Sequence, residues 1–467
     1  MLVNLLFPVE TIHRELDFRV VLAERMASRG YRVYIGKHEA CMRVAEHQRG
    51  GIFFGKGGIE PHQTGRLERL EFLKRRGYRF VHLDTEGAVY PGRPDQWRRI
   101  LDTRIDPSVL GPDDYICTWG DFQRDHYRST DPACAPNIRT TGHPRFDLYK
   151  PEFRDYFGPQ ADGIRSRFGD FVLVNTNLAK ANHKAGVEMV FSPAGGYFED
   201  DPDKRTAVVD TWFYKTQMLA HFVRMVHEVA TRRADLTFVV RPHPSEDERA
   251  YEHAFRGLRN VHVCREGAVS GWLLACAALI HDGCTTGIEA HLAGCPIINF
   301  RPVDHPTQEL LLPNSFGRRC TTACEVLQAL DELPGATDGV EPPELARALL
   351  ENFRSDSFLR VEDLLAEVAR TVTTSESPNY RLLRGVEVAH DALERAKRVV
   401  RPWSPRRMRQ WLHSQQKFAG FDAVDLTQRF ARAARIVGAK ARHTLLGREL
   451  VVVEPDGPPR GRGDEWE

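Results

Sequence analysis

The residues best suited to chemistry stand directly after an apolar run in the second half of the chain. Residues 236–240 predict a buried strand, which continues into the tetrapeptide Arg-Pro-His-Pro at 241–244. The two prolines stiffen this loop at the carboxyl edge of a sheet, where His243 could donate to a phosphate oxygen and Arg241 could neutralise a departing phosphate. We therefore predict a phosphate-binding corner at Arg241, His243 and Pro244, with an exposed histidine in a Pro-rich turn as the alternative.

A second candidate site lies further along the chain, where a strand turns into a helix. Residues 278–281 predict the strand, and residues 282–290 predict a tight turn that opens the helix. Free backbone amides at the helix start, with the hydroxyls of Thr285 and Thr286, predict an anion site, and Glu289 lies one turn further, within reach of ribose hydroxyls. The spacing of Thr286 and Glu289 is also that of a capping box, which needs no ligand. Both interpretations can hold together.

An acidic pair follows a strand in the first half of the chain. Residues 79–83 predict the strand, and Asp84, Thr85, Glu86 and Gly87 follow it. The carboxylates then project from the carboxyl end of a strand, where one could deprotonate an acceptor hydroxyl or attack an electrophilic carbon. Solvated acids in a capped turn are the structural alternative. The sequence leaves both Glu86 and Asp84 as candidates for the catalytic acid.

Two more loops of the first half are expected to line the same site. Glu10 and Arg14 follow the first strand, and Lys56 and Gly57 belong to a glycine-rich stretch at 55–58. The glycines allow the backbone to approach a ligand closely, and the two cations could meet an acidic donor or acceptor. We expect these four residues to contact the acceptor or the sugar of the donor.

Strands alternate with helices around these candidates. In the first half, strands are predicted at 2–7, 31–35, 51–54, 79–83, 115–118 and 138–140, and in the second half at 171–175, 236–240, 261–263, 278–281 and 296–300. Open α/β sheets bind ligands at the carboxyl ends of such strands. The fold class is therefore α/β, with two Rossmann-like doubly wound domains facing a cleft, at 1–150 and 151–370.

The end of the chain has a different character. Residues 381–450 contain 16 Lys plus Arg and 6 Asp plus Glu, a difference of +10, although the whole chain has a formal net charge of +1. We predict a basic helical extension at 371–453 and a disordered tail at 454–467. The basic helices brace the domains or contact an anionic membrane or lipid-linked acceptor. The balanced total charge argues against nucleic acid as a partner.

Composition also bears on metals and location. The nine cysteines form no Cys-x-x-Cys pair, which is typical of reduced, intracellular proteins. The one Asp-x-Asp, at 201–203, lies in a polar loop and predicts a turn, so we expect no metal and no cofactor. No apolar run is long enough to span a bilayer. We expect a cytoplasmic protein, with any membrane contact peripheral at the cytoplasmic face.

Three stretches resemble a bacterial family of surface carbohydrate biosynthesis proteins. They are Glu-Thr-Ile-His-Arg-Glu-Leu-Asp at 10–17, Thr-Trp-Gly at 118–120, and Thr-Gly-His-Pro-Arg-Phe-Asp at 141–147. The resemblance covers roughly the first 370 residues. It implies a GT-B fold and a place in the assembly of capsule, lipopolysaccharide or a related glycan.

The candidate residues together are similar to the motifs of bacterial GT-B sialyltransferases, polysialyltransferases and capsule Kdo transferases, which use CMP-activated acidic sugars. The resemblance implies that His243 and Pro244 contact CMP and that Thr285 and Thr286 lie near its phosphate. Glu86 and Gly87 match the second acid and the glycine of the acidic motif. The first acidic position is Thr85 here, a departure that keeps Asp84 as a candidate.

These observations predict a glycosyltransferase that moves an acidic sugar, Kdo or sialic-acid-like, from a CMP donor to a glycan or lipid-linked acceptor. Several alternatives stay open. Arg-Pro-His-Pro is also similar to glycerophosphotransferases that polymerise teichoic acids from CDP-glycerol, so a CDP-alditol donor is one of them. A UDP-sugar transferase or a sugar-nucleotide 2-epimerase would use the same fold. A non-catalytic nucleotide-sugar-binding component of the assembly machinery would need the phosphate corner but not the acids.

Overall fold

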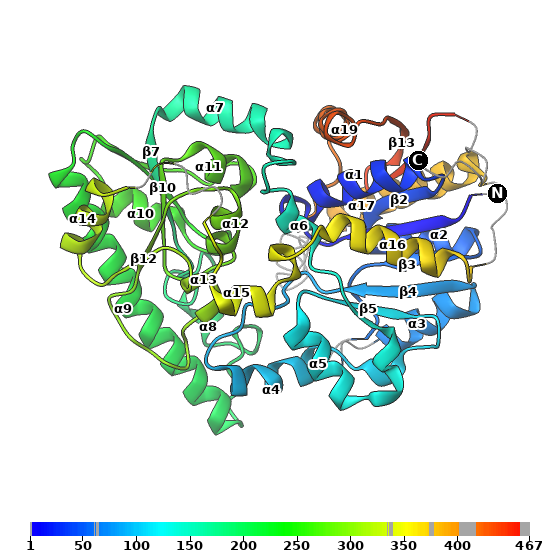
Figure 1. The fold of residues 1–467 in the computed structure, drawn as a ribbon, viewed down its shortest axis with the longest axis horizontal. Coiled ribbons are helices and arrows are strands. Elements are labelled where there is room, and N and C mark those ends of the chain that lie inside the picture. Colours follow the sequence, from blue (N-terminus) through cyan, green and yellow to red (C-terminus); the bar gives the residue numbers. More distant parts are fainter. Residues whose placement is uncertain are drawn as a thin grey trace. The chain divides into compact units, whose positions relative to one another are not determined.

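The computed structural model describes residues 2–59, 61, 65–333, 335, 340–372, 378–400 and 417–457, without the side chains of 398–400. The chain forms two compact units (Figure 1). Unit 1 contains segments 1–87, 101–148 and 348–467, and unit 2 contains segments 88–100 and 149–347. Each unit has its own sheet.

The sheet of unit 1 has eight strands in the order β13-β14-β2-β1-β3-β4-β5-β6. The six strands β1 to β6 are parallel, and all residues of β1, β3 and most of β4 are buried, as expected for strands covered on both faces. Their order reverses between β1 and β3, which makes this the switch point where such sheets bind ligands. The strands are β1 Asn4–Val9, β2 Arg32–Lys37, β3 Gly51–Phe54, β4 Tyr78–Leu83, β5 Tyr115–Thr118, β6 Ile138–Thr140, β13 Ala441–Gly447 and β14 Leu450–Pro455.

Helices cover the sheet of unit 1, and α1 is the most deeply buried of the early ones. Its buried side includes Leu16, Val20 and Ala23, which recur every three or four residues as in any amphipathic helix. The main helices of this unit are α1 Ile12–Ser28, α2 His38–His47, α3 Arg66–Arg75, α5 Asp121–Thr130, α6 Pro144–Asp147, α16 Ser357–Ala369, α17 Tyr380–Val400 and α19 Ala423–Val437; α4 Pro94–Arg104 and α15 Glu344–Leu349 each begin in unit 2 and end in unit 1.

The sheet of unit 2 has six parallel strands in the order β12-β11-β10-β7-β8-β9. Counted from β7, this is the Rossmann order 6-5-4-1-2-3, and its switch point lies between β7 and β10. The strands are β7 Phe171–Asn175, β8 Thr237–Arg241, β9 Val261–Val263, β10 Ala278–His281, β11 Ile297–Phe300 and β12 Arg318–Cys320.

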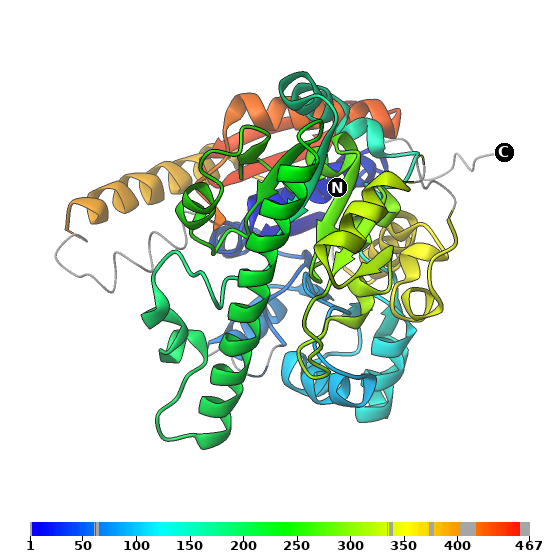
Figure 2. The same ribbon diagram turned by 90° about the vertical axis from the view of Figure 1, so that its left-hand side faces the viewer.

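One long helix dominates the packing of unit 2. It is α9, Pro202–Arg232, whose buried residues Met218, Phe222, Met225 and Val229 form one core with the inner residues of β7 and β8. Figure 2 shows α9 as the long green helix in front of the sheet. The other helices are α7 Gly158–Phe168, α8 Val187–Val190, α10 Glu248–Ala254, α11 Val269–Ala275, α12 Thr286–Leu292, α13 Leu311–Asn314 and α14 Ala323–Asp331.

The predicted fold class is confirmed: the chain is α/β, with two Rossmann-like doubly wound units and additional helices near the C-terminus, the components of a GT-B-like fold. The predicted strands at 51–54, 115–118, 138–140, 171–175, 261–263 and 278–281 match the observed bounds to the residue. The runs at 51–54, 115–118, 171–175 and 278–281 are mostly apolar and lie next to turn residues, so both their length and their limits are visible in the sequence.

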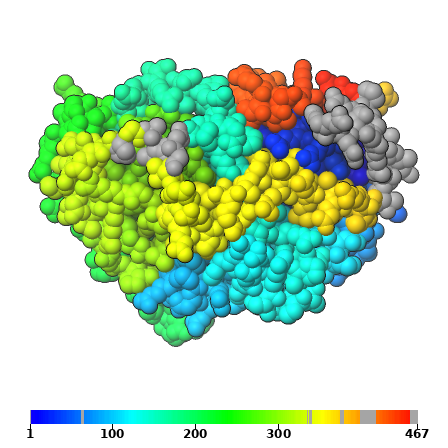
Figure 3. Space-filling view, in the orientation of Figure 1, coloured from blue at the N-terminus to red at the C-terminus, as the bar shows by residue number. Residues whose placement is uncertain are grey.

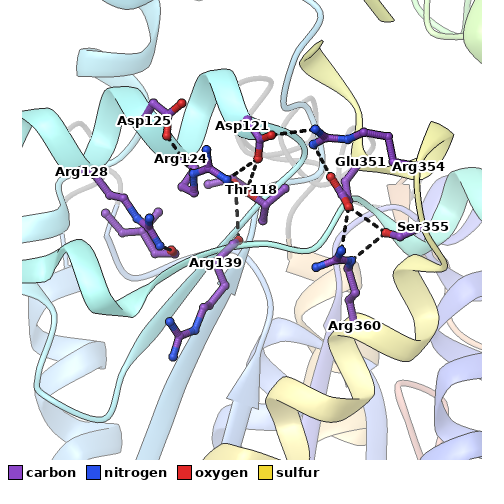
Figure 4. Close-up of polar contacts among 12 residues, drawn as sticks. Thr118, Asp121, Arg124, Asp125, Arg128, Arg139, Glu351, Arg354, Ser355 and Arg360 are labelled. Carbon is purple, nitrogen blue, oxygen red and sulfur yellow. Dashed lines mark hydrogen bonds and ion pairs between the residues drawn. The ribbon is translucent and has the colours of Figure 1, made fainter. Parts of the chain in front are cut away.

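The limit predicted at residue 370 differs from the structure, because residues 348–370 belong to unit 1. The backbone amide of Glu351 donates to the carbonyl of Trp119 at 2.7 Å, and Asn352 Nδ2 donates to Asp147 Oδ1 at 2.7 Å. Arg354 pairs with Asp121 at 2.8 Å, within the polar cluster of Figure 4. In Figure 3, α16 is part of the yellow band that crosses unit 1.

The predicted helical extension at 371–453 also needs a correction. Its described part contains the helices α17 and α19, but its end forms the antiparallel hairpin β13–β14, which extends the first sheet by pairing β14 with β2. Leu450 and the three valines that follow it are buried, and β-branched residues favour a strand. The predicted disordered tail begins inside β14, and its residues 458–467 lie outside the described residues. Among the described residues, no helix is long and apolar enough to cross a membrane.

Candidate functional site

The histidine of the predicted phosphate corner has a defined tautomer. His243 follows β8 in an exposed turn, and the backbone amide of Ser245 donates to its Nδ1 at 3.2 Å. Loss of part of the ring's hydration, together with the nearby cations Lys184 and Arg265, lowers the pKa of His243 to about 4. The ring is therefore neutral at pH 7 with its proton on Nε2. An exposed N–H donor thus stands at the carboxyl edge of the second sheet.

A buried carboxylate fixes this turn. Glu246 is 1% exposed and accepts hydrogen bonds from the backbone amides of His243, at 3.2 Å, and Leu178, at 2.8 Å, and from the hydroxyls of Thr176 and Tyr251. It thereby ties the turn after β8 to the loop after β7. Glu246 could not be predicted from the sequence, because its role depends on a loop sixty-eight residues away.

Three cations surround the histidine turn. Lys184 Nζ and Arg265 Nη1 both donate to the carbonyl of Pro244, at 2.8 and 3.0 Å. Arg241 donates to the carbonyls of Glu266 and Gly267, at 3.1 and 2.6 Å. Burial lowers the pKa of Arg241 to about 10, which leaves it charged at pH 7. Arg265 also pairs with Glu248 at 2.7 Å. Lys184 and Arg265 follow β7 and β9, and neither was predicted from the sequence.

The hydroxyl pair predicted near the phosphate lies at the switch point of unit 2. Thr285 precedes α12 and Thr286 begins it, and both are half-buried. The side chain of Thr285 caps no amide, and the hydroxyl of Thr286 contacts the Cys284 sulfur. The capping box allowed by the sequence is therefore not formed by these two hydroxyls. Asn177, after β7, donates to the carbonyl of Gly283 at 3.1 Å and so links the two loops of the switch point.

Two acids stand behind this turn. Asp282 is 4% exposed and pairs with Lys215 of α9 at 3.1 Å. Glu289, predicted near the ribose, is also 4% exposed, so it lies beneath the surface that Thr285 and Thr286 present. The side chains available to a ligand on this edge therefore include those of His243, Lys184, Arg265 and the two threonines.

In unit 1, the predicted acid Glu86 is exposed after β4. Its Oε1 accepts a hydrogen bond from Arg14 Nη1 at 2.7 Å, and its Oε2 lies 3.9 Å from Arg104. Partial burial acts to raise its pKa, but Arg14, Lys56 and Arg104 outweigh it and lower the pKa of Glu86. The carboxylate is thus ionised at neutral pH and reachable from solvent.

Asp84 is in a different position from Glu86. It is 5% exposed and forms a two-pronged ion pair with Arg104, at 2.8 and 2.9 Å. The backbone amide of Glu86 donates to the same carboxylate at 3.1 Å, and Trp119 Nε1 donates to the Asp84 carbonyl at 2.7 Å. A Cβ on Gly87 would lie 2.8 Å from the Trp119 ring, so only glycine fits there. Asp84 fixes the turn that presents Glu86.

The remaining predicted residues of unit 1 gather at its switch point. Glu10 follows β1 and pairs with Lys417 at 2.7 Å and with Lys56, after β3, at 3.7 Å. Gly57 has φ +106°, a left-handed conformation that favours glycine, and it places the loop against His38. The structure thus brings Glu10, Arg14, Lys56, Gly57, Asp84 and Glu86 to one edge, and Arg241, His243, Pro244, Thr285, Thr286 and Glu289 to the edge of the other sheet.

No group of three potential metal ligands occurs among the described residues. The Asp-x-Asp stretch forms the start of α9, where Asp201 accepts a hydrogen bond from the backbone amide of Lys204 at 3.0 Å. This is an N-cap, a common role for aspartate.

No protein-family model matches this chain, and no curated protein sequence matches it. Among solved structures, the wall teichoic acid polymerase TagF is similar at 12% identity and a TM-score of 0.47, over 79% of this chain and 89% of that chain. UDP-GlcNAc 2-epimerase from Methanocaldococcus jannaschii is similar at 10% identity and a TM-score of 0.49, over 79% of this chain and 100% of that chain. The enzyme from Neisseria meningitidis bound to UDP-GlcNAc is similar at 12% identity and a TM-score of 0.44, over 78% and 100%. The function of this chain is therefore inferred from its own residues.

Proposed function

We propose that this chain is a cytoplasmic, GT-B-like glycosyltransferase that moves an acidic sugar, Kdo or sialic-acid-like, from a CMP donor to a glycan acceptor in surface polysaccharide assembly. The observation that carries the proposal is the neutral His243, whose Nε2–H is exposed at the carboxyl edge of a Rossmann-ordered sheet. A donor fixed in this way can hydrogen-bond a phosphate oxygen without first losing or gaining a proton.

The surroundings of His243 support a phosphate ligand. Lys184 and Arg265 converge on the Pro244 carbonyl beside the ring, and Thr285 and Thr286 lie at the neighbouring switch point. These groups would stabilise the negative charge that develops on the phosphate as its bond to the sugar breaks. The bond between the anomeric carbon and the phosphate oxygen breaks, and CMP departs with its electron pair.

Glu86 is the acid that we assign to the chemistry. As a base, it would take the proton of the acceptor hydroxyl while the hydroxyl oxygen bonds to the anomeric carbon; in a retaining route it would attack that carbon first. Both roles require an ionised carboxylate, and Arg14 keeps Glu86 in this form. Asp84 is held by Arg104 and is less suited to either role.

A CDP-alditol donor is the second candidate, and one observation favours it. Two cations, Lys184 and Arg265, stand beside His243, whereas a nucleoside monophosphate has only one phosphate for them. A nucleoside diphosphate would offer each of them oxygen atoms. In that reaction the oxygen of the acceptor hydroxyl bonds to the phosphorus of the alditol phosphate, and its proton goes to Glu86. The bond from this phosphorus to the oxygen that bridges the two phosphates breaks, and CMP departs with the electron pair.

The test is a thermal-shift panel with CMP, CDP, UMP, UDP and GDP on the wild-type chain, on His243→Ala, and on the control His253→Ala, which alters an exposed histidine of α10. A ligand that binds only the native state stabilises it by about 2.7 kcal/mol at a hundredfold excess over Kd. We expect a shift with CMP or CDP that His243→Ala abolishes and His253→Ala retains.

The other outcomes of the panel are equally informative. A shift with UDP alone would contradict the cytidine donor and favour a UDP-sugar transferase or an epimerase. No shift with any nucleotide would contradict the enzyme proposal. In a third outcome, the chain binds cytidine nucleotides but releases no CMP from CMP-linked acidic sugars or CDP-alditols in the presence of acceptor extracts. This result would favour a non-catalytic binding component.

A further inference from the structure

Helix α17, residues 380–400, carries an unusual exposed apolar face. Of its large apolar side chains, Leu382, Val388 and Leu393 are 47%, 55% and 53% exposed. Leu382 and Leu393 share one face with Gly385, Ala389 and Ala396, at successive spacings of three, four, four and three residues. Since a helix turns once in 3.6 residues, these positions form one continuous stripe along its length.

Cations border this stripe. Arg381, Arg384 and Arg395 are exposed along one margin and Lys397 along the other. The three acids of the helix are not exposed: Glu387 is buried against Arg43 at 2.7 Å, and Asp391 and Glu394 are half-buried. The exposed face of α17 therefore combines apolar side chains with three arginines, while its acids are buried or half-buried and Glu394 pairs with Lys397 at 3.0 Å.

Only the first half of α17 is anchored. Leu383 and Glu387 are 2% and 1% exposed, and the helix packs on β13 and α2, where a Cβ on Gly447 would lie 2.6 Å from Glu387. From 391 to 397 no residue is buried. Figure 2 shows α17 as the gold helix at the left margin. Packing against unit 1 thus leaves the apolar stripe uncovered over the whole described helix.

We propose that the exposed face of α17 docks on an anionic lipid surface. Helices that lie in a membrane interface have this composition, with an apolar stripe between basic margins whose long side chains reach the headgroups. Negative lipids attract each such cation, and the apolar stripe enters the boundary of the acyl chains. This proposal does not depend on the proposed function, since no candidate site residue belongs to α17.

The experiment is co-sedimentation of the full chain with vesicles, either of phosphatidylcholine alone or of equal parts phosphatidylcholine and phosphatidylglycerol. We expect wild type to sediment with the anionic vesicles only, and less at high salt, because salt screens the attraction. Replacing Arg381, Arg384 and Arg395 by Gln should lower the partition coefficient roughly 100-fold, since each cation near the surface contributes about a factor of five.

A second variant and a matched control distinguish the effect of the apolar stripe on vesicle binding from the effect of total charge. Replacing Leu382, Val388 and Leu393 by Ser removes the three large exposed apolar side chains of the helix, two from the stripe and Val388 from its arginine margin. Partitioning should fall by about 100-fold as well. The control replaces Arg75, Arg224 and Arg249 by Gln; these side chains are 69%, 78% and 74% exposed on α3, α9 and α10, and their loss changes the total charge equally. All six α17 positions are exposed, so the thermal unfolding of each variant should match wild type.

Three results would overturn the proposal. Wild type could fail to sediment with anionic vesicles, or the α17 variants could bind them as wild type does. In the third, wild type would stay in the supernatant and form a dimer that the Leu382, Val388 and Leu393 variant dissociates. That last result would assign the stripe to contact between copies of the chain.

Discussion

Two histidine-proline turns of this protein have the same local structure and different surroundings. In unit 1, the backbone amide of Arg145 donates to His143 Nδ1 at 3.1 Å, and in unit 2 the amide of Ser245 donates to His243 Nδ1 at 3.2 Å. His143 is fully buried, with its ring 5.0 Å from Phe18 and 5.2 Å from Trp119, whereas His243 is exposed. The same dipeptide therefore builds a core in one unit and a surface in the other.

A His-Pro pair of this kind therefore specifies a local turn but does not by itself specify a binding site. The stretch 141–147, which carries part of the family resemblance, serves architecture here: Asp147 accepts hydrogen bonds from Asn352 and from the backbone amide of Ser357 and so holds the start of α16. The similar turn at His243 is fixed by Glu246 from beneath and leaves the ring free of the core. Burial, rather than the residue pair, separates the two roles.

The two strand edges also differ in how they use charge. In unit 1 each cation meets a carboxylate: Arg14 meets Glu86, Arg104 meets Asp84, and Lys56 meets Glu10. In unit 2, Arg265 pairs with Glu248, but Arg241 and Lys184 donate to backbone carbonyls. Carbonyls do not cancel a positive charge, so the second edge is the one suited to bind an anion, and the first is suited to position a carboxylate.

The sharpest test of this division is Glu86→Gln. If unit 1 supplies the chemistry and unit 2 supplies the binding, turnover should fall by about 10²–10⁴-fold, the usual contribution of a positioned acid or base, while the nucleotide thermal shift is unchanged. CMP release and the thermal shift are measured on the same preparation. The control is Glu71→Gln on α3, whose carboxylate is 66% exposed and should alter neither quantity. Full turnover in Glu86→Gln would move the assignment to Asp84.

The two histidine turns predict opposite results for the same substitution. His143→Ala removes a ring packed among Phe18, Trp119 and Phe146 and should lower the free energy of unfolding by about 2–4 kcal/mol, as for other large-to-small changes in cores. His243→Ala should leave the free energy of unfolding within about 0.5 kcal/mol of wild type and abolish the nucleotide shift. Denaturant unfolding with and without CMP or CDP measures both. Loss of stability in both variants would contradict the comparison.

Much of the fold could be predicted because its strands are apolar runs that end at turn residues, as in β3, β5 and β10. The hairpin β13–β14 was missed because the basic composition of the surrounding sequence favoured helices, although the three valines of β14 are a strand signal. The segment around Glu351 was placed in the wrong half, since the contacts that attach it to unit 1 are made by single side chains more than two hundred residues away.

The candidate site was predictable to the extent that its residues follow strands directly. Glu86 and His243 were found because each stands just after an apolar run. Lys184 and Arg265 were missed, as they lie in loops whose course depends on packing. The pairing of Asp84 with Arg104 was invisible as well, because it requires α4 to return to the end of β4. Local sequence shows which residues follow a strand, but it does not show which residues of distant loops contact each other.

Buried neutral histidines predict a loss of stability in acid. Burial lowers the pKa of His281, the fully buried last residue of β10, from 6.5 to about 4. Between these values the unfolded state binds more protons than the folded state, so stability is full above pH 6.5 and falls as the pH drops toward 4, by about 3 kcal/mol for this one group. His281→Asn keeps an acceptor for the amide of Gly283 but does not titrate. Its melting temperature should fall less than that of wild type between pH 7 and pH 4.5; an equal fall would contradict the role of His281.

The smallest expected effect concerns the two cations beside His243, and it sharpens the choice of donor. A hydrogen bond to a charged group contributes about 1.5–3 kcal/mol, so Lys184→Ala should weaken CDP binding at least about 10-fold. If the donor is a nucleoside diphosphate, CMP should bind Lys184→Ala nearly as well as wild type, because its single phosphate is held by His243. If the donor is a CMP-sugar, CMP and CDP should weaken together. Arg265→Ala provides the second comparison, and Arg256→Ala, an exposed arginine after α10, is the control. Equal binding of both nucleotides by all three variants would leave His243 as the phosphate ligand and contradict a role for either cation.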